Sequence, residues 1–351
     1  MAFFYPPLYA PPTHRHPPST HSLVMNVPLS QKSALHASLA RLDGLSPSNK
    51  LAAIREIYHA DVDWNGPHPI NHLAGADAVL SGFWVPLLAA MPDVERRDDV
   101  FIANTFKAGN WVGATGYLSG TFTADWLGIP ATGGVLNIRY GEFSRMESGR
   151  VREVYLILDI LDVLRQAGCW PVGLPKSPGI SDRVPGPATR DGVALSPHND
   201  DEGTQSLALV EAMIAGLMSY DRLTLESMGM ERFWHPQMMW YGPAGIGTSR
   251  ALKGFQDVHQ RAFLKAFPDR IGGDHKARIG EGAYVGSAGW PSVRATHLGP
   301  WLGVPATERR ISMRVMDFWR REDNLLRENW VFIDQLDLLR QMDFDVMARL
   351  S

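Results

Sequence analysis

The chain contains one sequence pattern twice. WLGIPAT, which begins at Trp126, returns as WLGVPAT at Trp301, 175 residues later, and the two copies then align without a gap as far as Gln166 and Gln341. Of these 41 aligned positions, 18 are identical. The identities include three charged pairs: Arg139 and Arg314, Glu153 and Glu328, and Asp159 and Asp334. Repeats of solenoid proteins are only about 20 to 50 residues long. We therefore predict a duplicated domain.

The distribution of proline and glycine sets the domain limits. The first residues, MAFFYPPLYAPPTHRHPPSTH, carry too many prolines for a helix, and a second proline-rich stretch follows Cys169. We predict a disordered tail at residues 1–45, a first domain at 46–168, a Pro/Gly-rich linker at 169–205 and a second domain at 206–351. A chain of 351 residues suits two cores, because single cores stop growing near roughly 250–300 residues.

Composition excludes several classes of protein. The formal net charge is −3 and the basic residues are dispersed, so we predict no nucleic-acid partner. The single cysteine cannot form an internal disulfide or a structural zinc site, and no pair of histidines has zinc-protease spacing, so we predict no metal. No apolar run reaches the roughly 20 residues that span a bilayer. We expect a cytoplasmic protein without a membrane partner.

Each copy changes from helical to strand periodicity along its length. Apolar residues recur every three or four positions at 48–59 and 76–91 in the first copy, and at 206–233 and 249–267 in the second. Long segments with strand character follow, separated by glycine turns. Helices followed by a meander of strands predict an α+β fold with an antiparallel sheet in each domain.

The end of each copy resembles a known family. WLGIPATGG, FSRMESGRVRE and YLILDILDVLRQAG are similar to the C-terminal signature of the SnoaL-like polyketide cyclases, which have the nuclear transport factor two-like fold, and the second copy resembles it equally. The resemblance implies two cone-shaped domains, each a curved sheet with N-terminal helices packed over its concave face. It implies no cofactor. Because this fold serves several reactions, it specifies the architecture better than the chemistry.

The last predicted strand of each copy carries an aspartate at its end. With alternating side chains, Asp159 shares a face with Tyr155, and Asp334 shares one with Trp330. Apolar neighbours would raise the pKa of such an aspartate and make it a proton-transfer group, and the resemblance implies that general acid/base role for Asp159 and Asp334. The structural alternative is that each aspartate caps the following helix, although Asp162 and Asp337 are the better candidates for that.

Other residues are expected to bind the substrate. Arg139 and Arg314, on the preceding strand, could hold a carboxylate or an enolate oxygen, or could form structural ion pairs with Glu153 and Glu328. Tyr155, Trp330, His59 and His297 are further candidates for the pocket wall, and a packed or partly exposed imidazole is the structural alternative for each histidine.

We predict an enzyme of the lyase or isomerase type. A pocket aspartate would move a proton beside a carbonyl of a small, mostly apolar substrate, in a cyclisation, isomerisation or dehydration. An epoxide or lactone hydrolase is the enzymatic alternative, and a non-catalytic ligand-binding or dimerisation module is the alternative of another class. The duplication predicts an internal pseudo-dimer and leaves a homodimer of the whole chain open.

Overall fold

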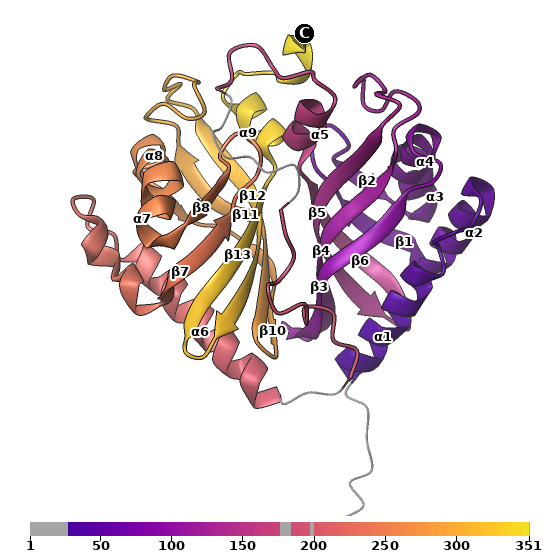
Figure 1. Cartoon of the computed structure of the whole chain (residues 1–351), viewed down its shortest axis with the longest axis horizontal. Coiled ribbons are helices and arrows are strands. Elements are labelled where there is room, and N and C mark those ends of the chain that lie inside the picture. Colours follow the sequence, from indigo (N-terminus) through magenta and orange to yellow (C-terminus); the bar gives the residue numbers. More distant parts are fainter. Residues whose placement is uncertain (1–26, 176–183, 197–199, 351) are drawn as a thin grey trace, which may run out of the picture.

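The protein is described by a computed structural model that covers residues 27–175, 184–196 and 200–350. It consists of two units of the same plan, with their sheets side by side in the centre and most helices on the two outer flanks (Figure 1). Each unit has helices before and beside a curved sheet, and a short helix follows the last strand. The predicted α+β class with two related domains is confirmed.

The first unit begins with two helices and ends with a helix that follows its last strand. Its elements are α1 (Val27–Ala40), α2 (Pro47–Ile57), β1 (Tyr58–Asn65), β2 (His72–Ala74), α3 (Ala76–Val79), the π-helical turn η1 (Leu80–Trp84), α4 (Val85–Ala90), β3 (Glu95–Phe106), β4 (Gly109–Thr121), β5 (Val135–Glu147), β6 (Arg150–Leu158) and α5 (Ile160–Gln166).

The second unit repeats this order with one long opening helix. Its elements are α6 (Asp200–Met218), η2 (Leu225–Met228), η3 (Met230–Arg232), β7 (Trp234–Tyr241), β8 (Thr248–Arg250), α7 (Ala251–Phe255), the π-helical turn η4 (Gln256–Gln260), α8 (Arg261–Ala266), β9 (Ile271–Gly272), β10 (His275–Glu281), β11 (Tyr284–Thr296), β12 (Arg310–Glu322), β13 (Leu325–Ile333), α9 (Gln335–Gln341) and η5 (Met347–Arg349).

The sheets are mixed, where the sequence predicts purely antiparallel ones. The strand order is β2-β1-β6-β5-β4-β3 in the first unit and β10-β11-β12-β13-β7-β8 in the second. Most neighbours run antiparallel, but β1 pairs with β6 and β7 pairs with β13 in parallel. A parallel pair needs a long connection, and in each unit nearly the whole domain separates the two strands. The sheets are curved and do not close.

Alternation along the strands gives each sheet two buried faces. One face is concave and covered by the helices of its own unit, with a core that includes Leu156 and Val331. The opposite face packs against the other unit, in a second cluster that includes Tyr155, Phe143, Phe318 and others from both sheets. We call these the concave face and the inter-unit face.

Equivalent residues of the two units meet at the inter-unit face. Phe143 and Phe318, which occupy the same position of the repeat, stack with ring centroids 5.3 Å apart. Glycines allow the close approach of the sheets: a Cβ at Gly141 would lie 2.9 Å from the Phe332 ring, and one at Gly286 would lie 2.8 Å from Phe143. Contact between identical positions is the pattern of an isologous interface.

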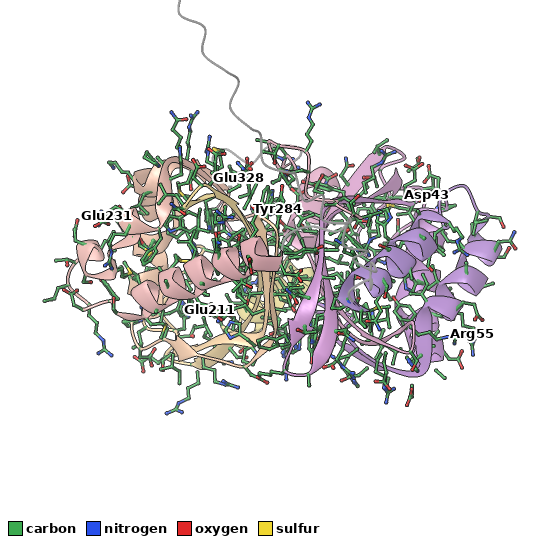
Figure 2. All side chains as sticks on the ribbon, turned by 90° about the horizontal axis from the view of Figure 1, so that it is seen from below. Asp43, Arg55, Glu211, Glu231, Tyr284 and Glu328 are labelled. Carbon is green, nitrogen blue, oxygen red and sulfur yellow. The ribbon has the colours of Figure 1, made fainter. Side chains whose placement is uncertain are left out.

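The segment at 184–196 lies between the two sheets and bonds to both (Figure 1). The Val184 N–H donates to Tyr117 Oη at 2.7 Å, and Trp330 Nε1 donates to the Pro185 carbonyl at 2.9 Å. Tyr284 and Glu328 lie at this junction of the units (Figure 2), where both Glu328 oxygens accept the Ala188 N–H at 3.3 Å. This part of the predicted linker is therefore built into the interface.

Two predicted boundaries need correction. The tail predicted at 1–45 contains helix α1 from Val27, whose Leu35 and Leu39 are buried, so a tail can extend no further than residues 1–26, which lie outside the described residues. The linker predicted at 169–205 ends earlier, because α6 starts at Asp200 with three acidic residues in its first turn. Acidic residues stabilise the start of a helix. The prediction placed this boundary by the prolines and overlooked these acidic residues.

Candidate active site

The concave face of the second unit encloses a cavity of about 290 Å³. Its floor is formed by strands β10 to β13 and β7, and α6 and the α7–η4–α8 helix cover it. Most of its walls are apolar or aromatic. The lining includes Met213, Trp234, Trp240, Phe255, Phe263, Val293, Met313, Val315, Trp319, Val331 and Ile333, with polar groups from His259, His275, Ser287, Ser292, Asp317 and Asn329. An apolar cavity with a few convergent polar groups is the usual form of a small-molecule site.

Strand alternation brings Asp317 into this cavity. On β12, Asp317 shares the concave face with Val315 and Trp319, and on the neighbouring β13 the residues on that face include Asn329 and Val331. Asn329 Nδ2 donates to Asp317 Oδ1 at 3.4 Å and to the Phe318 carbonyl at 3.1 Å. The Asp317 carboxyl is thus held at its position by a neighbour that is itself tied to the backbone.

The Asp317 carboxyl has an unusual acidity. Burial raises the pKa of Asp317 to about 7, against the smaller opposing effects of the Asn329 hydrogen bond and the Arg278 charge. Desolvation penalises the charged form of a carboxyl, while donors and cations favour it. Here desolvation is the larger effect. The group therefore exists in both protonation states near neutral pH.

Polar side chains cross the sheet in a row from β10 to β12. Arg278 pairs in register with Ser287 on β11, and Ser287 pairs with Asp317 on β12. Arg278 Nε donates to Ser287 Oγ at 3.4 Å, and its charge interacts with both Glu211 of α6 and Asp317. Directly opposed side chains on one face of a sheet are close neighbours, so the Ser287 hydroxyl lies between the cation and the carboxyl.

Two histidines line the cavity as uncharged groups. His259 stacks on Trp240 with centroids 4.8 Å apart, and burial lowers its pKa to about 3. His275 Nε2 lies 3.3 Å from Ser292 Oγ, and burial, followed by the Arg278 charge, lowers its pKa to about 4. At neutral pH both imidazoles are neutral, so each can offer one donor and one acceptor.

The same region of the first unit is filled. Glu142 occupies the position of Asp317 in the repeat, but its carboxylate accepts from Arg96 Nη1 at 3.0 Å, and Arg96 Nε also binds Asp98 at 3.0 Å. Tyr140 donates to Asp98 and packs beneath the Arg96 guanidinium, 4.5 Å from the ring centroid. The void that Arg96, Glu142 and Tyr58 line measures about 10 Å³. Its charges are paired, and the space is too small for a substrate.

Asp159 and Asp334 lie at the inter-unit face. Each is the N-cap of its following helix: Asp159 Oδ1 accepts the Asp162 N–H at 3.3 Å, and Asp334 Oδ1 accepts the Asp337 N–H at 3.2 Å. The other oxygens reach across the interface, to the Ala244 N–H at 2.9 Å and to the His68 N–H at 3.0 Å. Burial raises the pKa of both to about 6.

This placement bears directly on the predicted roles. Asp162 and Asp337 were the expected caps, but each helix begins one residue after Asp159 or Asp334, so the cap falls to those aspartates. Neither borders the 290 Å³ cavity. Asp159 borders a void of about 20 Å³ that it shares with Arg139, Tyr117 and other residues. The carboxylates are thus bound by backbone donors and face the other unit.

Arg139 and Arg314 do not make the ion pairs considered for them. Arg139 donates to the carbonyls of Tyr241 and Gly242 at 3.0 and 3.1 Å and lies over the Phe332 ring. Arg314 Nη1 pairs with Asp334 at 3.0 Å. The glutamates pair with the arginines directly opposite them in register: Arg145 with Glu153 at 2.8 Å, and Arg320 with Glu328. Arg139 and Arg314 lie six residues before these arginines, in the first half of the same strands.

The four remaining candidates also lie outside the cavity wall. Tyr155 Oη donates to Glu153 at 2.6 Å within the inter-unit cluster, and Trp330 stacks on Tyr241 there, with centroids 5.5 Å apart. His59, on β1, has its Nε2 2.9 Å from the Glu147 carbonyl. His297 is fully buried against Phe267, with Nδ1 3.0 Å from Thr307 Oγ1.

The polar lining of the cavity is a set of residues that sequence reasoning missed. In SMRVMDFWRRE, Asp317 alternates with Met313, Val315 and Trp319. A carboxyl at an otherwise apolar set of alternating positions was the available signal. No group of three or more His, Cys, Asp or Glu suited to a metal ion occurs among the described residues.

Comparison with known proteins identifies the family. The family model of the SnoaL-like polyketide cyclases matches residues 39–167 and 221–342, which together make more than two thirds of the chain. The chain belongs to the SnoaL-like polyketide cyclase family. It carries two copies of the family domain, in agreement with the duplication. None of the curated proteins compared matches it.

Several solved structures are similar to one SnoaL-like copy at a time. AclR of Streptomyces galilaeus, described as a putative hydroxylase, has 24% identity, covers 40% of this chain and 82% of its own, and gives a TM-score of 0.33. IdmH of Streptomyces antibioticus, a putative polyketide cyclase, has 24% identity, covers 39% of this chain and 99% of its own, and gives 0.33. No helix among the described residues is long and apolar enough to span a membrane.

Proposed function

We propose that this SnoaL-like protein is a cofactor-independent acid/base enzyme whose active site is the cavity of the second unit, with Asp317 as the proton-transfer group. The observation that carries the proposal is the Asp317 carboxyl in an apolar cavity, with a pKa of about 7. A general base acts best when its pKa lies near the working pH. The substrate class is a mostly apolar carbonyl compound, as the aromatic lining suggests.

The proposed reaction starts with proton transfer from carbon. The Asp317 carboxylate removes a proton beside the substrate carbonyl, which leaves a carboxylic acid and an enolate. The Ser287 hydroxyl accepts from Arg278 and keeps its own O–H for donation to the enolate oxygen. The proton then returns to another carbon in an isomerisation, or to the new alkoxide when the enolate attacks a second carbonyl in a cyclisation. No redox partner is needed.

The two copies would then differ in role. In the first unit the carboxylate equivalent to Asp317 is paired with Arg96 and the space is filled. A carboxylate that is already bound by an arginine makes a poor proton shuttle. We propose that the first unit supports the second and does not turn over substrate.

Exchange of substrate hydrogen with solvent tests the proposal without a known physiological substrate. We would incubate the protein with a panel of aryl ketones and β-keto esters in D₂O and follow deuterium uptake beside the carbonyl by mass spectrometry. We expect wild type to accelerate exchange for part of the panel, and Asp317→Asn to lose about 100-fold or more of that rate.

The matched variants are Asp159→Asn and Asp334→Asn, which change the carboxyls at the inter-unit face. We expect both to keep exchange within about threefold of wild type once folding is checked by circular dichroism. Persistent exchange in Asp317→Asn, or its loss only in an inter-unit variant, would refute the assignment. Ligand binding without any exchange by wild type would favour a non-catalytic binding module.

A further inference from the structure

The cavity of the second unit has a mouth beside the end of α6. Among its lining residues, Met218 and Ile271 are the apolar side chains most open to solvent, with 52% and 59% of their surface exposed. Met218 ends α6, and Ile271 starts β9 after the turn that follows α8. A ligand that fills the cavity would therefore have one end at this rim.

A half-buried arginine lies at the rim. Arg270 lines the cavity, and its guanidinium donates from Nη2 to the Leu217 carbonyl at 3.1 Å. Its guanidinium also lies 5.5 Å from the Tyr220 ring centroid. A guanidinium has five N–H donors in a planar fork, so this bond leaves most of its donors for another partner.

No carboxylate of the described residues neutralises Arg270. Burial lowers its pKa, and the charge of Arg222 adds to that effect, while only Tyr220 opposes them. Asp269, which precedes Arg270, and Asp221, which follows Tyr220, are engaged elsewhere. Asp269 accepts the Thr296 N–H and hydroxyl at 2.8 and 2.7 Å, and Asp221 accepts two backbone N–H groups of its own turn.

Support of the α6 terminus is the structural explanation for Arg270, because a cation favours the C-terminal end of a helix. One bond to the Leu217 carbonyl could be made by an amide or an ammonium as well. Support of the helix end therefore does not explain why this residue is an arginine whose charge is uncompensated. A charge without a partner is costly at the wall of an apolar cavity. An anionic ligand group would compensate that charge.

We infer that the cavity of the second unit binds an amphiphilic carboxylate, with its apolar body among the aromatic residues inside and its carboxylate on Arg270 at the mouth. The planar fork of arginine fits a carboxylate in two parallel hydrogen bonds. A ligand carboxylate at the mouth also stays away from the Asp317 carboxylate, which would repel it. The inference rests on the proposed function only in assigning the ligand to this cavity.

Three probes with one apolar body test this inference on the full-length chain: decanoate, methyl decanoate and decylamine. Binding is measured by titration calorimetry at pH 8, below the critical micelle concentration of each probe. We expect decanoate to bind wild type at least tenfold more tightly than the methyl ester, and decylamine to bind more weakly than either. Arg270→Gln should reduce the preference for the acid to less than twofold, and Arg270→Lys should keep part of it.

Arg294→Gln is the matched control. Arg294 is exposed on β11 and borders a surface cleft with Ile271, but it does not line the cavity. We expect this variant to keep the full preference, which separates a contact at Arg270 from a general effect of positive charge. Thermal unfolding identifies any Arg270 variant that fails to fold. If Arg270→Gln fails to fold, the preference of Arg270→Lys for decanoate over the methyl ester tests the inference.

The outcomes separate this inference from the proposed function. Equal binding of acid and ester by wild type, an intact preference in Arg270→Gln, or no binding of any probe would overturn the inference. Asp317→Asn should keep the preference for decanoate because it leaves the mouth unchanged. If Asp317→Asn retained proton exchange while Arg270→Gln lost the carboxylate preference, the proton-transfer proposal would fail and the binding site would stand.

Discussion

At the scale of single residues, Asp317 has the environment with the clearest consequence. The folded state favours the protonated form of its carboxyl, because burial raises the pKa from 3.8 to about 7. Well below pH 3.8 it is protonated in the folded and unfolded states alike. Between pH 4 and 7 the unfolded chain loses this proton while the folded chain keeps it, so the contribution of Asp317 to stability falls as the pH rises.

Replacement of Asp317 by Asn should therefore stabilise the protein at high pH. The difference in unfolding free energy between Asp317→Asn and wild type should shift in favour of the variant by up to about 4 kcal/mol from pH 4 to pH 8, since one pKa unit corresponds to about 1.4 kcal/mol. Urea unfolding at several pH values measures this. Asp323→Asn, in the exposed turn after β12, is the control, and an equal shift there would contradict the prediction.

At the scale of elements, period-two alternation predicted which strand residues share a face. It could not show which face the helices cover. In most two-layer folds the apolar face is the covered one, but here both faces of each sheet are buried, one by helices and one by the other unit. Asp159 and Asp334 were therefore predicted on the pocket side, and Asp317 was passed over.

The fold itself was predictable because its signals are local. Glycine turns and the repeated WLGxPAT motif depend on a few neighbouring residues. Site residues such as Arg278, Ser287 and Asp317 come together only through the register of β10, β11 and β12. Pairing across strands is a long-range property, and one sequence contains little record of it.

Helix α1 holds the units together through one buried ion pair. Lys32 is fully buried and binds Glu281 of the second unit and the Ala194 carbonyl, while Glu281 also accepts the Ala103 N–H of the first unit. Removal of one partner of a buried pair leaves a charge without compensation, which costs about 3–5 kcal/mol.

We therefore expect Lys32→Met to destabilise the chain by about 3 kcal/mol in equilibrium urea unfolding. The double variant Lys32→Met/Glu281→Gln should recover a large part of this loss, because glutamine can still accept the Ala103 N–H and carries no charge. Additive losses in the double variant would show that the two side chains act independently.

At the scale of the whole molecule, the two units share a core and are not merely linked. The inter-unit cluster contains aromatic residues of both sheets, including the stacked pair Phe143 and Phe318, and the caps Asp159 and Asp334 each bind backbone of the other unit. The segment at 184–196 bonds to both. Neither unit could keep this face buried alone.

We predict one cooperative unfolding transition for wild type in differential scanning calorimetry. Phe318→Asp would bury a charge beside Phe143 and should separate the profile into two transitions or lower the melting temperature by more than about 10 °C, since 1 kcal/mol shifts it by only a few degrees. Leu223→Asp, on a side chain with 85% exposure, should leave the profile unchanged. Two resolved transitions in wild type would contradict this prediction.

The concave faces of the two units can evolve separately, and the filled face of the first unit is an example. In a homodimer of identical domains every substitution occurs in both subunits. One position therefore cannot be optimised for structural support in one subunit and for ligand binding in the other. Here the Arg96–Glu142 pair and the Asp317 cavity occupy equivalent places, yet each is encoded separately. A substitution that reshapes the cavity of the second unit leaves the Arg96–Glu142 pair intact, so the two concave faces can change independently.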